Sequence, residues 1–234
     1  MERLDKIVAS AVSESRKNAR GLILRGRVSV NSKTVTDIAF KVDAANDEIM
    51  VDGEVITYKK FVYIMINKPK GVLSASNDRS RETVIDLVKP EFPRDGLFPV
   101  GRLDKDTTGL LIITDDGEFG HTVISPKSKI EKEYIVTMDR PITDENISVL
   151  GQGVTLADGT VCRPAIVKKC SDANKISMTI TEGKYHEIKR MLGVVGIGVN
   201  ELSRIRIGKL RLDVQLLQGQ YRELSPKEVS FVWK

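Results

Sequence analysis

Residues 101–117 read Gly-Arg-Leu-Asp-Lys-Asp-Thr-Thr-Gly-Leu-Leu-Ile-Ile-Thr-Asp-Asp-Gly, which joins a charged loop to an apolar run. The apolar run, 110–114, lies between a glycine and an Asp-Asp-Gly turn, and this pattern predicts a buried strand. Because a loop anchored on a buried strand holds its side chains rigidly, we expect chemistry in the charged half, with Asp104 as the first candidate. On spacing alone, Asp104 and Asp106 fit turn or capping residues at least as well.

The same stretch resembles the catalytic motif of the RsuA/RluB group of pseudouridine synthases. The resemblance covers the Gly-Arg-Leu-Asp start, the Thr-Gly-Leu that follows and the Thr-Asp-Asp-Gly turn. In that family the Asp of the motif is the nucleophile, so the resemblance places this role on Asp104. It also implies that Arg102 fills the gap that the target base leaves in the RNA stack.

Two further segments are similar to motifs of this family. Lys132-Glu133-Tyr134 matches a Lys-x-Tyr motif, which implies that Tyr134 stacks on the target base and is a candidate to move a proton from its ring. A strand tyrosine is otherwise by default a half-buried core residue.

The third motif matches Gly-Lys-Tyr-His-Glu-Ile-Lys-Arg-Met at 183–191. There Lys189 corresponds to the basic partner of the catalytic carboxylate, and a cation at about 4 Å keeps an Asp ionised for attack. Arg190 is expected to contact RNA, and a solvent-facing basic helix start is the alternative for both residues. The sequence departs from the family at Glu187, where Gln is usual. An acid here could pair with a neighbouring cation and weaken RNA contact.

The positive charge of the chain is concentrated at its N-terminus. Residues 1–33 hold three acidic side chains (Glu2, Asp5, Glu14) and eight basic ones, so this segment carries the whole formal net charge of +5. A basic segment on a near-neutral body indicates a polyanion-binding module joined to a second domain. The basic residues are Arg3, Lys6, Arg16, Lys17, Arg20, Arg25, Arg27 and Lys33.

The hydrophobic pattern of this segment predicts two helices followed by a small sheet. Apolar residues at helical spacing predict a helix over 4–11, and Ser13 or Ser15 starts a second helix that Gly26 ends. Short alternating runs then predict strands around an Asp52-Gly53 hairpin turn. The pattern resembles the small RNA-binding domain named after ribosomal small-subunit protein four. The resemblance implies that the seven cations from Arg3 to Arg27 contact RNA phosphates, with a solvated helix face as the alternative.

We place the domain boundary at residue 58, because Tyr58-Lys59-Lys60 has no apolar period and precedes a strong strand. The prediction is an α+β protein. A basic RNA-binding domain of two helices and a small sheet spans 1–58, and a catalytic domain with a mixed, largely antiparallel sheet spans 59–234. The Asn-Lys-Pro-Lys-Gly turn at 67–71 is expected to be structural, although Lys68 or Lys70 could reach a phosphate.

The composition argues against several other classes of protein. The two cysteines, Cys162 and Cys170, provide no disulfide framework and do not favour a zinc site. The N-terminus lacks the apolar core of a signal peptide, and no apolar run approaches the roughly 20 residues of a membrane span. We therefore expect a cytoplasmic protein that binds no metal and does not act at a membrane.

The resemblance implies an isomerase that converts a uridine of ribosomal RNA to pseudouridine without a cofactor. The bond from ribose to N1 breaks, the base turns, and C5 forms the new bond after the base has left its stack at a cost of a few kcal/mol. The motif details are closer to the small-subunit (16S) enzymes of the family, so we expect small-subunit rRNA or an assembling particle as partner. Attack at ribose C1′ and at uracil C6 both fit the sequence.

Three other interpretations stay open at this stage. The first is a pseudouridine synthase that acts on large-subunit rRNA, and the second is a non-catalytic ribosome-assembly factor that only holds rRNA. In the third, Asp104, Asp106, Asp115 and Asp116 bind a divalent metal for phosphodiester cleavage. Against this, a five-residue strand separates the two pairs by roughly 15 Å.

Overall fold

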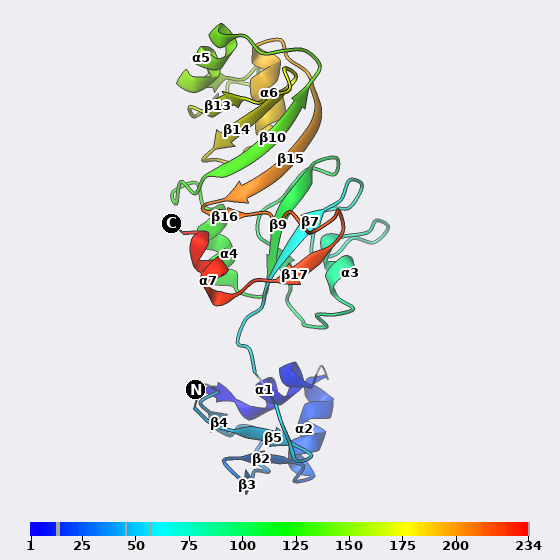
Figure 1. Ribbon diagram of the computed structural model, residues 1–234. Coiled ribbons are helices and arrows are strands. Elements are labelled where there is room, and N and C mark those ends of the chain that lie inside the picture. Colours follow the sequence, from blue (N-terminus) through cyan, green and yellow to red (C-terminus); the bar gives the residue numbers. More distant parts are fainter. Residues whose placement is uncertain (13–14, 45, 57, 234) are drawn as a thin grey trace. The chain divides into compact units, whose positions relative to one another are not determined.

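The computed structural model divides the chain into two compact units, which are described separately below. The first unit comprises Met1–Phe61 and the short segment Pro93–Asp95, and the second comprises Val62–Phe92 and Gly96–Lys234. Figure 1 shows residues 1–61 of the first unit from blue to cyan, and the second unit from cyan to red. The residues that the structure describes are 1–12, 15–44, 46–56 and 58–233, so Ser13 and Glu14 lie outside them.

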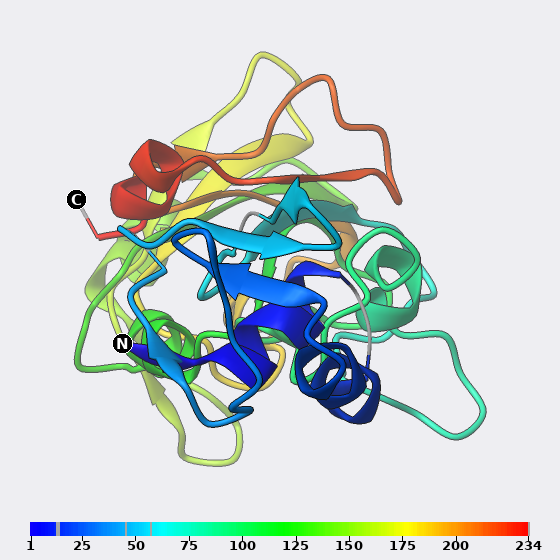
Figure 2. The same ribbon diagram turned by 90° about the horizontal axis from the view of Figure 1, so that it is seen from below.

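The first unit packs two helices on a small sheet, as the sequence predicts (Figures 1 and 2). Helix α1 (Leu4–Ala11) contacts α2 (Arg16–Leu24), which begins where the Ser15 hydroxyl accepts a hydrogen bond from the Asn18 backbone N–H. The predicted hairpin turn is confirmed, because Asp52 and Gly53 both have positive φ and join two antiparallel strands. The strands are β1 (Glu2–Arg3), β2 (Val28–Val30), β3 (Lys33–Thr34), β4 (Lys41–Val42), β5 (Ile49–Val51) and β6 (Glu54–Val55). Sheet order is β3-β2-β5-β6, and β1 pairs with β4.

The second unit is built on one nine-stranded sheet. Its order is β13-β14-β10-β15-β9-β7-β17, with β16 paired to β15 and β8 to β9. Every pair is antiparallel except β9–β15, so the prediction of a mixed, largely antiparallel sheet is confirmed. The strands are β7 (Tyr63–Lys68), β8 (Phe98–Pro99), β9 (Thr108–Thr114), β10 (Lys132–Met138), β13 (Ile166–Lys169), β14 (Lys175–Ile180), β15 (Val199–Ile207), β16 (Leu210–Arg211) and β17 (Tyr221–Glu223).

Short helices cover this sheet, and a separate pair of strands stands beside it. The helices are α3 (Val84–Val88), α4 (Gly117–Ile124), α5 (Asp144–Gln152), α6 (Glu187–Val194) and α7 (Pro226–Phe231), and the pair is β11 (Val154–Thr155) with β12 (Val161–Cys162). In the described part of the chain, no helix is long and apolar enough to cross a membrane.

Strand β9 is buried on both faces, which explains its continuous apolar sequence. Leu111 and Ile113 belong to one core cluster, whereas Leu110 and Ile112 belong to the cluster on the other face of the sheet. All seven residues of the strand are buried. The predicted strand is therefore confirmed, and the charged loop that precedes it is fixed to the centre of the unit.

Gly109 lets β9 meet β15 at the point where the sheet becomes parallel. The two strands pair only through Thr108 with Ser203 and Gly109 with Arg204. Gly109 has φ +101°, and a Cβ there would lie 2.2 Å from the Arg204 carbonyl oxygen. A side chain at this position would thus separate β9, which follows the charged loop, from β15, which also pairs with β10.

Candidate active site

The charged loop, residues 101–107, is held by hydrogen bonds on both sides of Asp104. The Leu103 backbone N–H donates to the Ser74 hydroxyl at 3.1 Å, and that hydroxyl donates to the Leu103 carbonyl at 3.0 Å. The Gly71 N–H donates to the Lys105 carbonyl at 2.8 Å. The backbone around Asp104 is therefore set by the turn that follows β7.

Lys68 lies beneath this loop and cannot reach a phosphate, one of the two roles considered for it from the sequence. Its side chain is fully buried, and its ammonium donates to the carbonyls of Pro69, Lys105 and Thr107. Burial lowers the pKa of Lys68 to about 8, against the opposing effect of the Asp106 and Asp104 carboxylates. Lys68 therefore holds the backbone of the loop in place through these hydrogen bonds.

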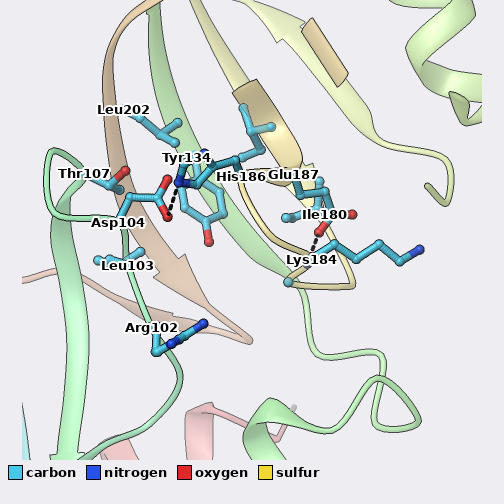
Figure 3. A pocket seen from close by; sticks show the side chains of 12 residues that line it. Arg102, Leu103, Asp104, Thr107, Tyr134, Ile180, Lys184, His186, Glu187 and Leu202 are labelled. Carbon is cyan, nitrogen blue, oxygen red and sulfur yellow. Dashed lines mark hydrogen bonds and ion pairs between the residues drawn. The ribbon is translucent and has the colours of Figure 1, made fainter. Parts of the chain in front are cut away.

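The Asp104 carboxylate faces a pocket and has two basic neighbours. Lys189 Nζ lies 3.6 Å from Oδ2, and His186 Nε2 lies 3.5 Å from Oδ1. Both neighbours belong to the segment that opens α6, whereas Asp104 comes from the loop before β9. Figure 3 shows His186 and Asp104 facing each other in the pocket. The structure thus joins two sequence motifs that are about 80 residues apart.

Lys189 contacts Asp106 more closely than it contacts Asp104. Its ammonium donates to the two Asp106 oxygens at 2.8 and 2.7 Å. This hydrogen bond is the main cause of the lowered pKa of Asp106. The expected pairing of Lys189 with Asp104 is present, but the lysine bridges two carboxylates.

Tyr134 and Thr107 line the same pocket. Tyr134 stands on the central strand β10 and is only 7% exposed, and Figure 3 shows its ring beside Asp104 and His186. The Thr107 hydroxyl is buried and has no hydrogen-bond partner among the described residues. An aromatic ring, a carboxylate and an unsatisfied hydroxyl thus converge on one small cavity.

The two arginines expected to contact RNA lie differently. Arg102 is exposed and lines the pocket from the same loop as Asp104 (Figure 3). Arg190 is partly buried and forms an ion pair with Asp158. The Arg190 guanidinium therefore already has an acidic partner within the protein.

Glu187 is buried in the pocket wall without the ion pair that the sequence suggested. Its carboxylate accepts a hydrogen bond from the Lys184 backbone N–H at 2.9 Å, and among the described residues it forms no ion pair with a basic side chain. Burial raises the pKa of Glu187, although this hydrogen bond opposes the change. Nearby, burial lowers the pKa of Lys132 to about 8.

His186 is the site residue that sequence reasoning missed. It precedes α6 with φ 49°, lines the pocket and stacks on Tyr185. Its position within the third motif, as one of only two histidines in the chain, was the available signal. Its contact with Asp104 depends on tertiary structure and has no trace in local spacing.

The seven N-terminal cations do not form one free basic surface. Arg3 and Arg20 both pair with the buried Asp5 carboxylate. Lys6 pairs with Glu2, and Arg27 with Asp52. Of these seven, the exposed cations Arg16, Lys17 and Arg25 have no acidic partner among the described residues.

The carboxylates of the proposed metal cluster do not converge. Asp115 accepts a hydrogen bond from the Val62 N–H, and Asp116 caps α4 and accepts from the Tyr63 hydroxyl. These contacts lie at the end of β9 opposite to Asp104. Within the described residues, no group of three or more His, Cys, Asp or Glu side chains is placed to hold a metal ion.

Comparison with known proteins places both units in known families. Residues 62–193 match the RNA pseudouridylate synthase family, and residues 2–49 match the S4 domain. The uncharacterized RNA pseudouridine synthase YtzG of Bacillus subtilis (strain 168) is 42% identical, over 97% of this chain and 96% of the relative. Ribosomal small subunit pseudouridine synthase A of Escherichia coli (strain K12) is 36% identical, over 98% and 99%.

A solved structure gives the same result for the fold. A crystal structure of a pseudouridylate synthase aligns with a TM-score of 0.69 and 33% identity, and covers 99% of this chain and 100% of that one. This match and the family matches confirm the predicted order of an RNA-binding domain followed by a synthase domain. The chain therefore belongs to the RNA pseudouridylate synthase family and is an RNA pseudouridine synthase with an N-terminal S4 domain.

Proposed function

We propose that the protein converts a specific uridine of small-subunit (16S) ribosomal RNA to pseudouridine, with Asp104 as the nucleophile. The observation that carries this proposal is the position of the Asp104 carboxylate. It lies on a loop held from both sides, in a pocket walled by Tyr134 and within 3.6 Å of the Lys189 ammonium.

Each of the converging groups has a role that the chemistry requires. Asp104 attacks ribose C1′ or uracil C6, and Lys189 stabilises the ionised carboxylate that such an attack needs. The N1–C1′ bond breaks and a C5–C1′ bond forms, while one proton leaves C5 and one is gained at N1. Tyr134 stacks on the detached ring and takes part in the proton transfer. The reaction has no net oxidation.

Recognition of the RNA is divided between the two parts of the chain. Residues 1–58 bind phosphates, mainly through Arg16, Lys17 and Arg25, the three of the seven cations that have no acidic partner among the described residues. Residues 59–234 form the catalytic domain, where Arg102 fills the gap left by the flipped base. With ribosomal RNA as substrate, the protein works in the cytoplasm.

The small-subunit assignment rests on the relatives. The Escherichia coli and Vibrio cholerae proteins named ribosomal small subunit pseudouridine synthase A are 36% and 39% identical over nearly the whole chain. Large-subunit rRNA is the alternative substrate.

Pseudouridine mapping by carbodiimide treatment and primer extension tests this assignment. Small-subunit rRNA, large-subunit rRNA and partly assembled particles are each incubated with the protein in the presence of EDTA. We expect one new stop, in small-subunit RNA alone. A stop confined to large-subunit RNA would select the alternative substrate, and no stop in any RNA would favour the assembly-factor interpretation.

A further inference from the structure

Tyr185 is a large aromatic residue that the fold leaves open to solvent. It is 70% exposed, the most exposed aromatic side chain among the described residues. Its ring lies flat on the His186 ring, with centroids 3.9 Å apart and an angle of 17° between the planes. One face of the tyrosine is therefore covered by His186, and its other face has no aromatic partner in the described part of the chain.

The ring stands at the rim of the active-site pocket. Gly183, Lys184 and His186, its neighbours in the chain, all line that pocket, and His186 Nε2 lies 3.5 Å from the Asp104 carboxylate. An RNA segment that places a nucleotide at Asp104 can therefore reach the Tyr185 ring. A flat, half-covered aromatic ring at such a place is suited to stack on a nucleobase, because every base presents a π-face.

The charges around Tyr185 favour a base over a phosphate as the group bound there. The Lys184 ammonium is paired with Glu182, and the Arg190 guanidinium is paired with Asp158. Lys189, the third cation that neighbours the ring in sequence, is paired with Asp106, so each of the three already has an acidic partner within the protein. The group that remains available at the rim is therefore the open face of the Tyr185 ring.

We propose that Tyr185 is a stacking platform for a base adjacent to the target uridine in the substrate RNA. When the uridine leaves its stack, Arg102 fills the gap, and the Tyr185 ring stacks on the adjacent base at the rim of the pocket. Stacking on one aromatic side chain offsets part of the cost of flipping, and the His186 ring behind Tyr185 links the platform to the Asp104 site. This inference rests on the proposed function only in that the RNA must be one the enzyme converts.

Kinetics with a short stem–loop RNA that carries the target uridine test the platform. We compare wild type, Tyr185→Ala and Tyr185→Phe, each with the intact RNA and with RNAs that have an abasic site on either side of the uridine. We expect Tyr185→Ala to raise KM about tenfold with kcat changed less than twofold, and Tyr185→Phe to behave as wild type. Removing the stacked base should raise the KM of wild type to the same extent and leave that of Tyr185→Ala unchanged.

A fluorescence measurement gives an independent readout. 2-Aminopurine at the position whose removal affects wild type should be quenched on binding to wild type and Tyr185→Phe, but not to Tyr185→Ala. Leu217, which is also 70% exposed but does not line the pocket, supplies the matched control, and Leu217→Ala should leave KM and quenching unchanged.

The two proposals fail in different ways in this experiment. Wild-type turnover of the stem–loop supports the proposed reaction whatever the variants do. The platform is wrong if Tyr185→Ala has the same KM as wild type on the intact RNA. It is also wrong if the abasic site raises the KM of Tyr185→Ala as much as it raises the KM of wild type. Equal losses in Tyr185→Phe and Tyr185→Ala would assign the effect to the hydroxyl and also overturn stacking.

Discussion

Glu187 shows how a single residue can depart from the motif of its family without losing its place in the fold. Its side chain is 5% exposed and is held by a backbone N–H, a contact that the amide of a glutamine can also accept. The acid therefore substitutes for the usual amide in shape and in hydrogen bonding, but it adds a group that can ionise inside the pocket wall.

This difference predicts a pH-dependent effect of Glu187→Gln on stability. Because the folded pKa of Glu187 is raised above its ordinary value of 4.5, the folded state binds more protons than the unfolded state above pH 4.5. The stability that Glu187 contributes is thus lost as the pH rises through the folded pKa. We expect wild type and Glu187→Gln to have similar free energies of unfolding near pH 4. At pH 8 the Gln variant should be the more stable of the two, because the wild-type carboxylate must ionise while it is buried.

Denaturant unfolding across this pH range measures the effect, and Glu182→Gln is the control. Burial acts to raise the pKa of Glu182, but the Arg163 backbone N–H and the Lys184 ammonium hold it below its usual value. Its contribution therefore has the opposite sign, and wild type should gain stability over Glu182→Gln as the pH rises. A Glu187→Gln difference that stays constant from pH 4 to 8 would contradict the account.

At the residue scale, the sequence motifs identified side chains that the fold brings together, but not all of the contacts that these side chains make. Asp104, Tyr134 and Lys189 line or border one pocket as the resemblance implies. The second carboxylate on Lys189, the pairing of Arg20 with Asp5 and the contact of His186 with Asp104 were not predicted. Each of these contacts joins residues that are distant in sequence, so local sequence patterns carry no information about it.

At the element scale, the junction of β9 with β15 leaves no room for a side chain at Gly109. The parallel pairing of these strands joins the loop that carries Asp104 to the sheet that carries Tyr134. The strand β9 could be predicted from its apolar run, because burial on both faces requires continuous hydrophobicity. Its parallel pairing with β15 could not be predicted, because β15 follows about 90 residues later in the chain.

Gly109→Ala should disrupt this junction. The added methyl group would meet the Arg204 backbone at 2.2 and 2.7 Å, and the residue has φ +101°. We expect a loss on the order of 4 kcal/mol in the free energy of unfolding, or failure to fold. Circular dichroism during thermal unfolding measures it.

Gly193→Ala is the matched control for that variant. Gly193 lies within α6 and has nothing within 4 Å of a built Cβ, so alanine there should raise stability by about 0.5–1 kcal/mol. A Gly109→Ala protein as stable as wild type would show that the two strands can separate without cost.

At the scale of the whole molecule, charge is divided between cations that hold the fold and cations that remain available. The sequence located the basic segment correctly, but composition cannot show which of its side chains are already paired. It also placed Pro93–Asp95 within the catalytic body, whereas these residues group with the first unit, because contacts across the chain leave no local pattern.

This division predicts the salt dependence of RNA binding. Replacing Arg16, Lys17 and Arg25 together with Ala removes three cations that have no acidic partner among the described residues. The slope of log K against log salt concentration for a single-stranded RNA should then fall by about 2. Filter binding between 50 and 300 mM salt measures the slope. Arg27 is paired with Asp52, so the control variant Arg27→Ala should change the slope by less than one third of that decrease. An unaltered slope in the triple variant would refute the assignment of Arg16, Lys17 and Arg25 to phosphate binding.

The central claim is that Asp104 performs the chemistry and does not merely bind RNA. Release of tritium from RNA labelled at uridine C5, measured for wild type and Asp104→Asn together with the RNA affinity of each protein, tests it most directly. We predict one tritium released per RNA by wild type and none by Asp104→Asn, with affinities that agree within a few fold because phosphate contacts elsewhere supply the binding. Release by Asp104→Asn at a rate within tenfold of wild type would contradict the claim, as would a loss of affinity large enough to account for the lost turnover.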